Sequence, residues 1–283
     1  MRRGGTWVAV AWTGWAVACG GANDHEGTRE APRPVTVEPA AFLEEVGAAS
    51  SVVLQRPRRS LEELEQARRD ARGQARRLAT RDAVVGLVFA ASEAEGREAR
   101  RLRRRAERLA DAAVRGSRDA SLRAEIAFAK LWLAWRAGSR LAERRAERFT
   151  TRHRESGDLL TLAWMIRGEI AFTDERYEDA VEAYRFALGN LGHPLYAFAL
   201  FRTAHAHRRL GHEERATQAF DEVEQLGCGR EVPRATLRIA TAAASERGSG
   251  LRIDTDGVTR PARCPSPEEL AVEPADEGWR PAE

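Results

Sequence analysis

Residues 60–246 consist almost entirely of helix-forming residues, interrupted by short clusters rich in glycine, serine and aspartate. Between the clusters, apolar residues recur three or four positions apart, which is the spacing of an amphipathic helix, and no alternating strand pattern occurs. Helices joined by such short connections pack as antiparallel neighbours. The sequence therefore predicts an all-α fold of antiparallel helical hairpins. The expected breaks lie at residues 96, 116–117, 138–139, 157–158, 192–194, 211 and 227.

The first helix of this predicted domain begins directly after Ser60. Ser60 and Glu63 have the spacing of a capping box, in which each side chain accepts a hydrogen bond from the backbone N–H of the other residue. Pro57 disfavours an earlier start, because proline interrupts the hydrogen bonding of a helix. Apolar residues then recur at helical spacing over residues 61–78, which predicts one continuous helix there.

The N-terminal residues have the features of a secretory signal. Arg2 and Arg3 supply a positive start, and residues 6–18 form an uncharged, mostly apolar run. As a helix this run would reach about 20 Å, which is shorter than the ~30 Å hydrocarbon core of a membrane. A charged start, a short apolar stretch and small residues at its end are typical of a cleaved signal. We therefore expect residues 1–18 to be a signal peptide.

The end of this signal, Ala16-Val17-Ala18-Cys19, resembles the lipobox of bacterial lipoproteins. The resemblance implies that Cys19 is diacylated and becomes the first residue after cleavage, so that the lipid anchors the protein to a membrane. Ala16 departs from the family pattern, which usually has leucine at that position. The alternative is an ordinary cleaved signal followed by an incidental cysteine.

The residues after Cys19 bear on the location of an anchored protein. Gly20 stands where, in enteric bacteria, an aspartate would imply retention in the inner membrane. The resemblance therefore favours the outer membrane, facing the periplasm, and leaves the cell surface and the inner membrane open. Residues 19–59 hold many small, polar and proline residues, which predicts a flexible linker between the anchor and the helical domain.

The most regular helical pattern lies in residues 161–190. Trp164 and Gly168 mark its first helix, and Ala180 and Tyr184 mark its second. Two helices approach closely only where a small residue faces a bulky one. We therefore expect Gly168 and Ala180 to pack against Trp164 and Tyr184.

This segment resembles a tetratricopeptide repeat (TPR), and residues 197–226 repeat its plan. Arg167 and Ala171 depart from the leucine and tyrosine that are usual in the family. The signature positions are occupied by Trp164, Gly168, Ala180, Tyr184 and Ala187 in the first segment and by Leu200, Ala204, Leu210, Gly211, Ala216, Phe220 and Val223 in the second.

The repeat resemblance implies a TPR-like solenoid, in which several hairpins stack because no single hairpin can bury its own apolar face. It assigns residues 60–157 to degenerate helical hairpins and residues 158–247 to tandem repeats with a closing helix. Residues 248–283 are rich in proline and are predicted to be a mostly disordered tail, with a small β-hairpin around Gly257.

The same resemblance implies a partner-binding groove. In such repeats the first helix of each pair lines a concave surface, which here would hold an extended peptide or a partner helix. The alternative is that some of these side chains are buried against neighbouring repeats. The expected groove residues are Leu162, Met165, Glu169, Phe172, Phe198, Phe201, His205 and Arg208.

Arginines are concentrated in residues 97–108, where they are interleaved with Glu98 and Glu107. One interpretation is the solvated face of a helix in a protein that uses arginine throughout. The other is contact with anionic lipid or polymer, where each basic residue near a membrane surface adds ~1 kcal/mol. The residues expected to make that contact are Arg100, Arg101, Arg104 and Arg105.

The two remaining cysteines are a candidate pair. If Cys19 carries lipid, an oxidising periplasm would permit a disulfide between Cys228 and Cys264. Two unrelated free thiols are the alternative, because spacing in the sequence does not show that two cysteines meet.

No arrangement of residues favours catalysis. The sequence has no Ser/His/Asp set, phosphate-binding glycine loop, Cys-x-x-Cys or His-Glu-x-x-His motif. His205 and His207 are two residues apart and would point in different directions on a helix, so we expect no metal site. The net charge of +3 is small for 283 residues and does not favour nucleic acid as a partner.

The sequence therefore predicts a protein that is not an enzyme and has no cofactor or small-molecule substrate. Its expected partners are envelope proteins or peptides, which it would bind as an adaptor or assembly scaffold while its lipid holds it to the membrane. The alternative is a surface or cell-wall protein that binds anionic lipid or polymer through the arginine-rich helix.

Overall fold

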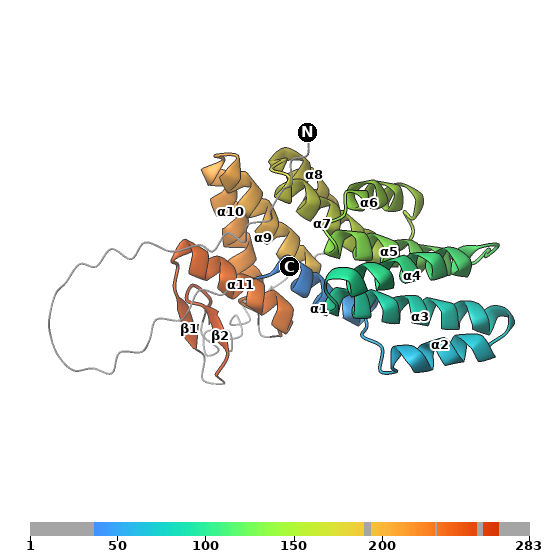
Figure 1. The fold of residues 1–283 in the computed structure, drawn as a ribbon. Coiled ribbons are helices and arrows are strands. Elements are labelled where there is room, and N and C mark those ends of the chain that lie inside the picture. The colour runs from blue at the N-terminus through green and yellow to red at the C-terminus, as the bar shows by residue number, and fades with distance from the viewer. Residues whose placement is uncertain (1–36, 190–193, 230, 254–256, 266–283) are drawn as a thin grey trace, which may run out of the picture. The chain divides into compact units, whose positions relative to one another are not determined.

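The computed structural model describes residues 37–189, 194–229, 231–253 and 257–265, all within the compact unit Pro34–Glu283. Helices dominate these residues, with one small two-stranded hairpin near the C-terminal end, so the fold is all-α (Figure 1). None of the helices in the described ranges is both long and apolar enough to cross a membrane. The signal peptide and Cys19 lie outside the described residues.

The element bounds follow the sequence pattern closely. Each predicted break within the described ranges lies at or beside a helix end. In chain order the elements are α1 (Pro39–Ser50), α2 (Leu61–Asp70), α3 (Gly73–Glu93), α4 (Gly96–Val114), α5 (Ala120–Arg136), α6 (Leu141–Arg152), α7 (Asp158–Thr173), α8 (Tyr177–Ala187), α9 (Pro194–Arg209), α10 (Glu213–Leu226), α11 (Arg234–Arg247), β1 (Leu251–Ile253) and β2 (Thr259–Pro261).

Helices α3 to α10 pack as successive pairs. The pairs α3–α4, α5–α6, α7–α8 and α9–α10 are in contact, and the second helix of each pair also contacts the first helix of the next element. The first helices contact one another in order, α3 with α5, α5 with α7, α7 with α9 and α9 with α11. The apolar core is therefore shared between neighbouring pairs instead of being enclosed by one of them.

Gly168 sets the spacing between α7 and α8. A Cβ atom at Gly168 would lie 2.3 Å from Cε1 of Tyr184, a distance that no side chain tolerates. The predicted approach of Gly168 and Tyr184 is therefore present in the structure. Trp164 does not complete this cluster and instead stacks on Phe186, with ring centroids 4.3 Å apart.

The predicted linker is wrong over the described residues 37–59, because α1 is part of the core. Phe42 and Leu43 are fully buried, and the Phe42 ring lies 4.5 Å from that of Phe198. Helix α1 contacts both α7 and α9. Prolines in residues 19–59 favour a flexible chain in the sequence analysis. Pro39, however, lies in the first turn of α1, where its missing N–H costs nothing.

A helix does begin after Ser60 as predicted, but the helical domain starts earlier, with α1, and the single helix predicted for residues 61–78 is wrong. The Ser60–Glu63 capping box is present, with the Ser60 N–H 2.7 Å from the Glu63 carboxylate. The chain then reverses between α2 and α3, where Gly73 has a φ of +55°. This reversal lets Leu64 pack onto Gly86 of α3, so tertiary packing overrides the local periodicity.

The tail predicted to be mostly disordered begins with ordered structure. Strands β1 and β2 pair antiparallel on either side of Gly257, where the sequence predicted a hairpin, and β2 packs on α11. The Arg263 guanidinium lies 2.7 Å from the carboxylate of Asp221 in α10. Residues 266–283 lie outside the described residues.

Candidate functional site

The predicted partner groove is not an open surface. Five of the eight residues that were expected to line it, on the first helices α7 and α9, are buried against neighbouring helices of the chain, namely α8, α10, α11 and α1. For these five residues the structure shows the alternative that the sequence left open. The buried residues are Leu162, Met165, Glu169, Phe198 and Phe201.

Glu169 is the most strongly bound of these residues. Its carboxylate accepts two hydrogen bonds from Arg202, of 2.7 and 2.9 Å, and one of 2.7 Å from the hydroxyl of Tyr184. Burial, followed by the charge of Glu169, raises the pKa of Tyr184 well above its ordinary value. Burial alone would lower the pKa of Arg202, but the carboxylate of Glu169 raises it. Glu169 therefore joins three helices and is not available to a partner.

The other expected groove residues also have partners within the chain. His205 Nε2 lies 3.3 Å and Arg208 Nη1 lies 3.5 Å from the carboxylate of Glu246 in α11. The Arg202 guanidinium covers the ring of Phe172 at 4.1 Å. Helices α9 and α11 thus contribute contacts that a bound peptide was expected to make.

An aromatic patch lies on another face of α7 and α8. Phe186 is 55% exposed although it is a large apolar residue, and it stacks on Trp164. The guanidinium of Arg167 lies 4.9 Å from the centre of the Trp164 ring. We call Trp164, Arg167 and Phe186 the aromatic patch.

A hollow of about 290 Å³ adjoins the aromatic patch, between α6, α7 and α8. Arg176 neutralises two of its carboxylates, at 2.6 Å from Glu143 and 2.8 Å from Asp179. Two further carboxylates that line it, Glu147 and Glu182, form no ion pair within the described part of the chain. Arg144 and Arg167 also line the hollow, so four carboxylates and three guanidinium groups lie there beside an apolar surface.

The sequence analysis missed Phe186. It lies off the apolar face of α8, which Ala180, Ala183, Tyr184 and Ala187 form and bury. A large aromatic residue on the polar face of an amphipathic helix was the signal available in the sequence. Its stacking partner could not be found that way, because the pairing depends on how α7 and α8 approach each other.

The arginine-rich helix α4 differs from the prediction at one residue. Arg105 forms an ion pair with the buried Glu65 of α2 and is therefore not free to contact an anionic surface. Arg100, Arg101 and Arg104 are exposed, as are Arg97 and Arg108. None of these five exposed arginines has an ion pair within the described residues.

Cys228 and Cys264 are joined by a disulfide in the structure, with Cα atoms 4.9 Å apart. Arg260 also donates hydrogen bonds of 3.0 and 2.9 Å to the carbonyl oxygens of Gly227 and Gly229. These contacts hold the β1–β2 hairpin to the end of α10.

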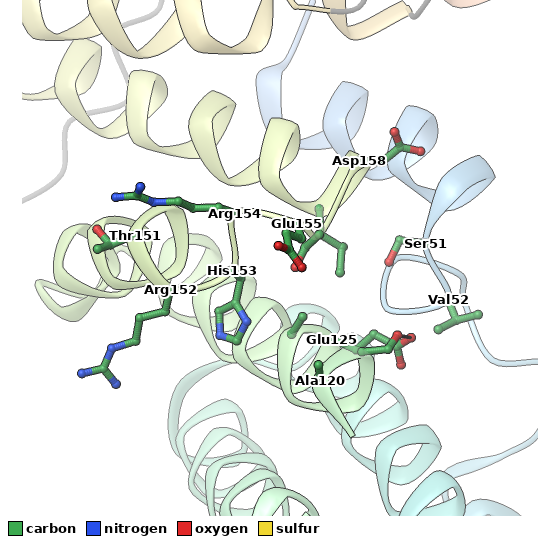
Figure 2. A pocket seen from close by; sticks show the side chains of 14 residues that line it. Ser51, Val52, Ala120, Glu125, Thr151, Arg152, His153, Arg154, Glu155 and Asp158 are labelled. Atoms are coloured by element: carbon green, nitrogen blue, oxygen red, sulfur yellow. Dashed lines mark hydrogen bonds between the residues drawn. The ribbon is translucent and has the colours of Figure 1, made fainter. Parts of the chain in front are cut away.

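A larger hollow, of about 770 Å³, lies between the end of α1, the start of α5 and the turn from α6 to α7. Figure 2 shows Arg152 and Arg154 at one end of it and Ser51 and Asp158 at the other, so its polar groups do not converge on one point. No hydrogen bond joins the His153 ring to a carboxylate or hydroxyl among the described residues. The absence of enzymatic activity stays a prediction from the sequence.

No protein-family model matches this chain, and neither a curated protein nor a solved structure is similar to it at a significant level.

Proposed function

We propose that this protein is a lipid-anchored cell-envelope protein whose helical domain binds other proteins, as an adaptor or assembly scaffold. The lipobox-like end of the signal supports an anchor at Cys19, and the absence of an inner-membrane retention residue at position 20 favours the outer membrane, facing the periplasm. The contacts between successive helix pairs support a TPR-like solenoid.

The observation that carries this proposal is the aromatic patch. Large apolar side chains are usually buried. Aromatic residues and arginine are enriched in protein interfaces, where tryptophan, tyrosine and arginine dominate the binding energy. Phe186 and Trp164 stack face to face, with planes 18° apart, and Arg167 covers Trp164. Such a preformed cluster loses little conformational freedom when a partner binds.

The charges beside the patch indicate the kind of partner. The four carboxylates of the adjoining hollow outnumber its three guanidinium groups by one, and a lysine or arginine of the partner would neutralise this net negative charge. An apolar side chain of the same partner would lie on Phe186. We therefore expect a protein segment that presents a basic residue next to an apolar one.

The proposal is tested by isolating the tagged full chain from detergent-solubilised envelopes. We expect a stoichiometric partner with the native chain and loss of that partner with Phe186→Ser, since removing a central interface aromatic costs about 2 kcal/mol or more, which is roughly thirtyfold in affinity. The matched control is Ile253→Ser, which removes an apolar residue in β1 that is even more exposed, at 74%. Recovery of no partner, or equal recovery with both variants, would refute the proposed interface.

The anchor is tested separately. We expect metabolic labelling with a radioactive fatty acid to label the native chain and not the Cys19→Ser variant. A labelled Cys19→Ser variant, or an unlabelled native chain, would refute lipidation at this residue and leave the protein interface untouched.

A further inference from the structure

A second hollow, of about 370 Å³, lies between α5 and α6 and has an unusual lining. Its floor is apolar, formed by Ala127 and Phe149, with Leu141 at its edge. No aspartate or glutamate is among the described residues that line it. Every ionisable residue that lines it is basic, namely Lys130, Arg144, Arg145, Arg148, Arg152 and His153.

Three of these residues follow one side of α6 at intervals of four. Arg144, Arg148 and Arg152 are exposed, and none of them has an ion pair or hydrogen bond within the described part of the chain. Like charges four residues apart on a helix repel each other and destabilise it. This side of α6 therefore carries an electrostatic repulsion that no ion pair of these arginines relieves in the described part of the chain.

The carboxylates of α6 lie on one side of the helix. Glu143 and Glu147 line the hollow toward α7 and α8 together with Arg144, whereas Arg148 and Arg152 line only the hollows toward α5 and the α6–α7 turn. Neither carboxylate lines the hollow between α5 and α6, so the positive charge there is not neutralised from α6 itself.

Two other basic residues of the hollow, Lys130 of α5 and Arg145 of α6, are paired with carboxylates of α4. Lys130 Nζ lies 2.7 Å from the Asp111 carboxylate, and Arg145 Nη2 lies 2.8 and 2.9 Å from the two oxygens of Glu107. Arg145 Nη1 also donates a hydrogen bond of 2.7 Å to the carbonyl oxygen of Lys130. These pairs neutralise Lys130 and Arg145, so the unneutralised charge comes from Arg144, Arg148 and Arg152.

We propose that the hollow between α5 and α6 is a binding site for a phosphate-bearing anion. Guanidinium groups match phosphate oxygens with paired hydrogen bonds and keep their charge at every relevant pH. A row of three arginines therefore suits a ligand with a phosphate group better than a ligand with one carboxylate. Leu141, which is 48% exposed at the edge, gives an apolar part of the same ligand a surface to cover. Arg144 also lines the hollow beside the aromatic patch, whereas Leu141, Arg148 and Arg152 do not, and the proposed anion site does not depend on the proposed protein interface.

The pKa of His153 also indicates positive charge at this hollow. Burial, followed by the positive charges of Arg123 and Arg152, holds its pKa below the ordinary 6.5. A bound anion would reverse the effect of those charges.

The test is calorimetric titration of the full chain, in a neutral detergent, with three probes at 0.15 M salt. The probes are glycerol phosphate, dihexanoyl phosphatidylglycerol and dihexanoyl phosphatidylcholine, the lipids being kept below their micelle concentrations. We expect at least one of the two anionic probes to bind, and phosphatidylcholine to bind at least tenfold more weakly, because its choline cation is repelled by the arginines. Equal binding of both anionic probes identifies the phosphate group itself as the ligand, and binding of the lipid alone identifies a headgroup with its apolar chain.

The deciding variant replaces Arg144, Arg148 and Arg152 with glutamine. A charge-assisted hydrogen bond contributes about 1.5–3 kcal/mol, so we expect the affinity for the anionic probe to fall by about tenfold or more. The variant should fold, since it removes repulsion within α6.

The matched control replaces Arg97, Arg100 and Arg101 of α4 with glutamine. It removes the same charge, but these residues lie six to ten positions, or about 9–15 Å along the helix, from Glu107, which contacts Arg145. Salt screens most of an interaction over that distance, so we expect less than about a twofold change. Equal losses in both variants would show non-specific attraction to a basic protein and overturn the proposal, as would no binding of either anionic probe.

Discussion

Arg202 of α9 and Glu169 of α7 form a buried ion pair with two hydrogen bonds, of 2.7 Å from Nε and 2.9 Å from Nη2. Their side chains are only 14% and 5% exposed. The pair lies where the sequence predicted an open groove. Its geometry shows that this surface is used to join neighbouring helix pairs.

Replacing Glu169 with alanine should therefore destabilise the fold severely. The change leaves the Arg202 charge buried and without its partner, which costs about 3–5 kcal/mol. Urea denaturation measures the loss. The control is Arg56→Ala, which breaks an exposed ion pair with Glu93 and should change the unfolding free energy by no more than about 1 kcal/mol. Similar losses in the two variants would show that the Glu169 pair is not buried in solution.

Gly168→Ala should also be destabilising, for a steric reason. The added Cβ would lie 2.3 Å and 2.5 Å from two ring carbons of Tyr184, which is fully buried and cannot move aside. Overpacking of this kind costs about 1–3 kcal/mol. Gly189→Ala is the control, since no atom lies within 4 Å of its added Cβ. The melting temperatures of the two variants measure the difference, and equal values would contradict the close approach of α7 and α8.

Helix α1 should behave as part of the core and not as a linker. Phe42→Ala removes a fully buried ring that packs against Phe198, and such changes cost about 3–5 kcal/mol. Val52→Ala, at a residue that is 41% exposed, should cost less than about 0.5 kcal/mol. Protease treatment of the native chain should spare α1. Rapid cleavage within α1 would show that it does not pack on α7 and α9.

The disulfide between Cys228 and Cys264 closes a loop of 36 residues. Loop closure of that length stabilises the folded chain by about 4 kcal/mol in the chain-entropy treatment. A reducing agent should lower the melting temperature of the native chain and leave the Cys228→Ser/Cys264→Ser double variant unchanged. A native chain that is insensitive to reduction, with two thiols that react with a labelling reagent, would favour two free cysteines.

The lowered pKa of His153 predicts a pH dependence. Below its ordinary pKa of 6.5 the unfolded chain binds a proton that the folded chain does not, so the unfolding free energy decreases as the pH falls from 6.5 to the folded pKa and is then constant. Arg152→Gln should raise the pKa of His153, which proton NMR titration measures. His207, whose pKa is lowered by burial and by His212 and Arg215, is the internal control and should not move.

The sequence alone determined the helical class and most helix ends. Periodicity and glycine clusters act within one or two turns of the chain, so the break at residue 96, the Ser60 cap and the hairpin around Gly257 could be predicted without any knowledge of distant contacts. The disagreement over residues 61–78 arose because the reversal before Gly73 is stabilised by packing of α2 on α3, which the local pattern does not contain.

Tertiary structure decided which surfaces are free. Glu169 and Arg202 are 33 residues apart in the sequence, and Glu45 and Arg238, which lie 2.7 Å apart, are separated by 193. Contacts over such separations depend on how the helices stack, and the same residue type is buried or exposed according to its neighbour. That is why most of the expected groove residues are buried against neighbouring helices, Arg105 is paired with Glu65, and the exposed Phe186 and the arginine row of α6 become the candidate binding surfaces.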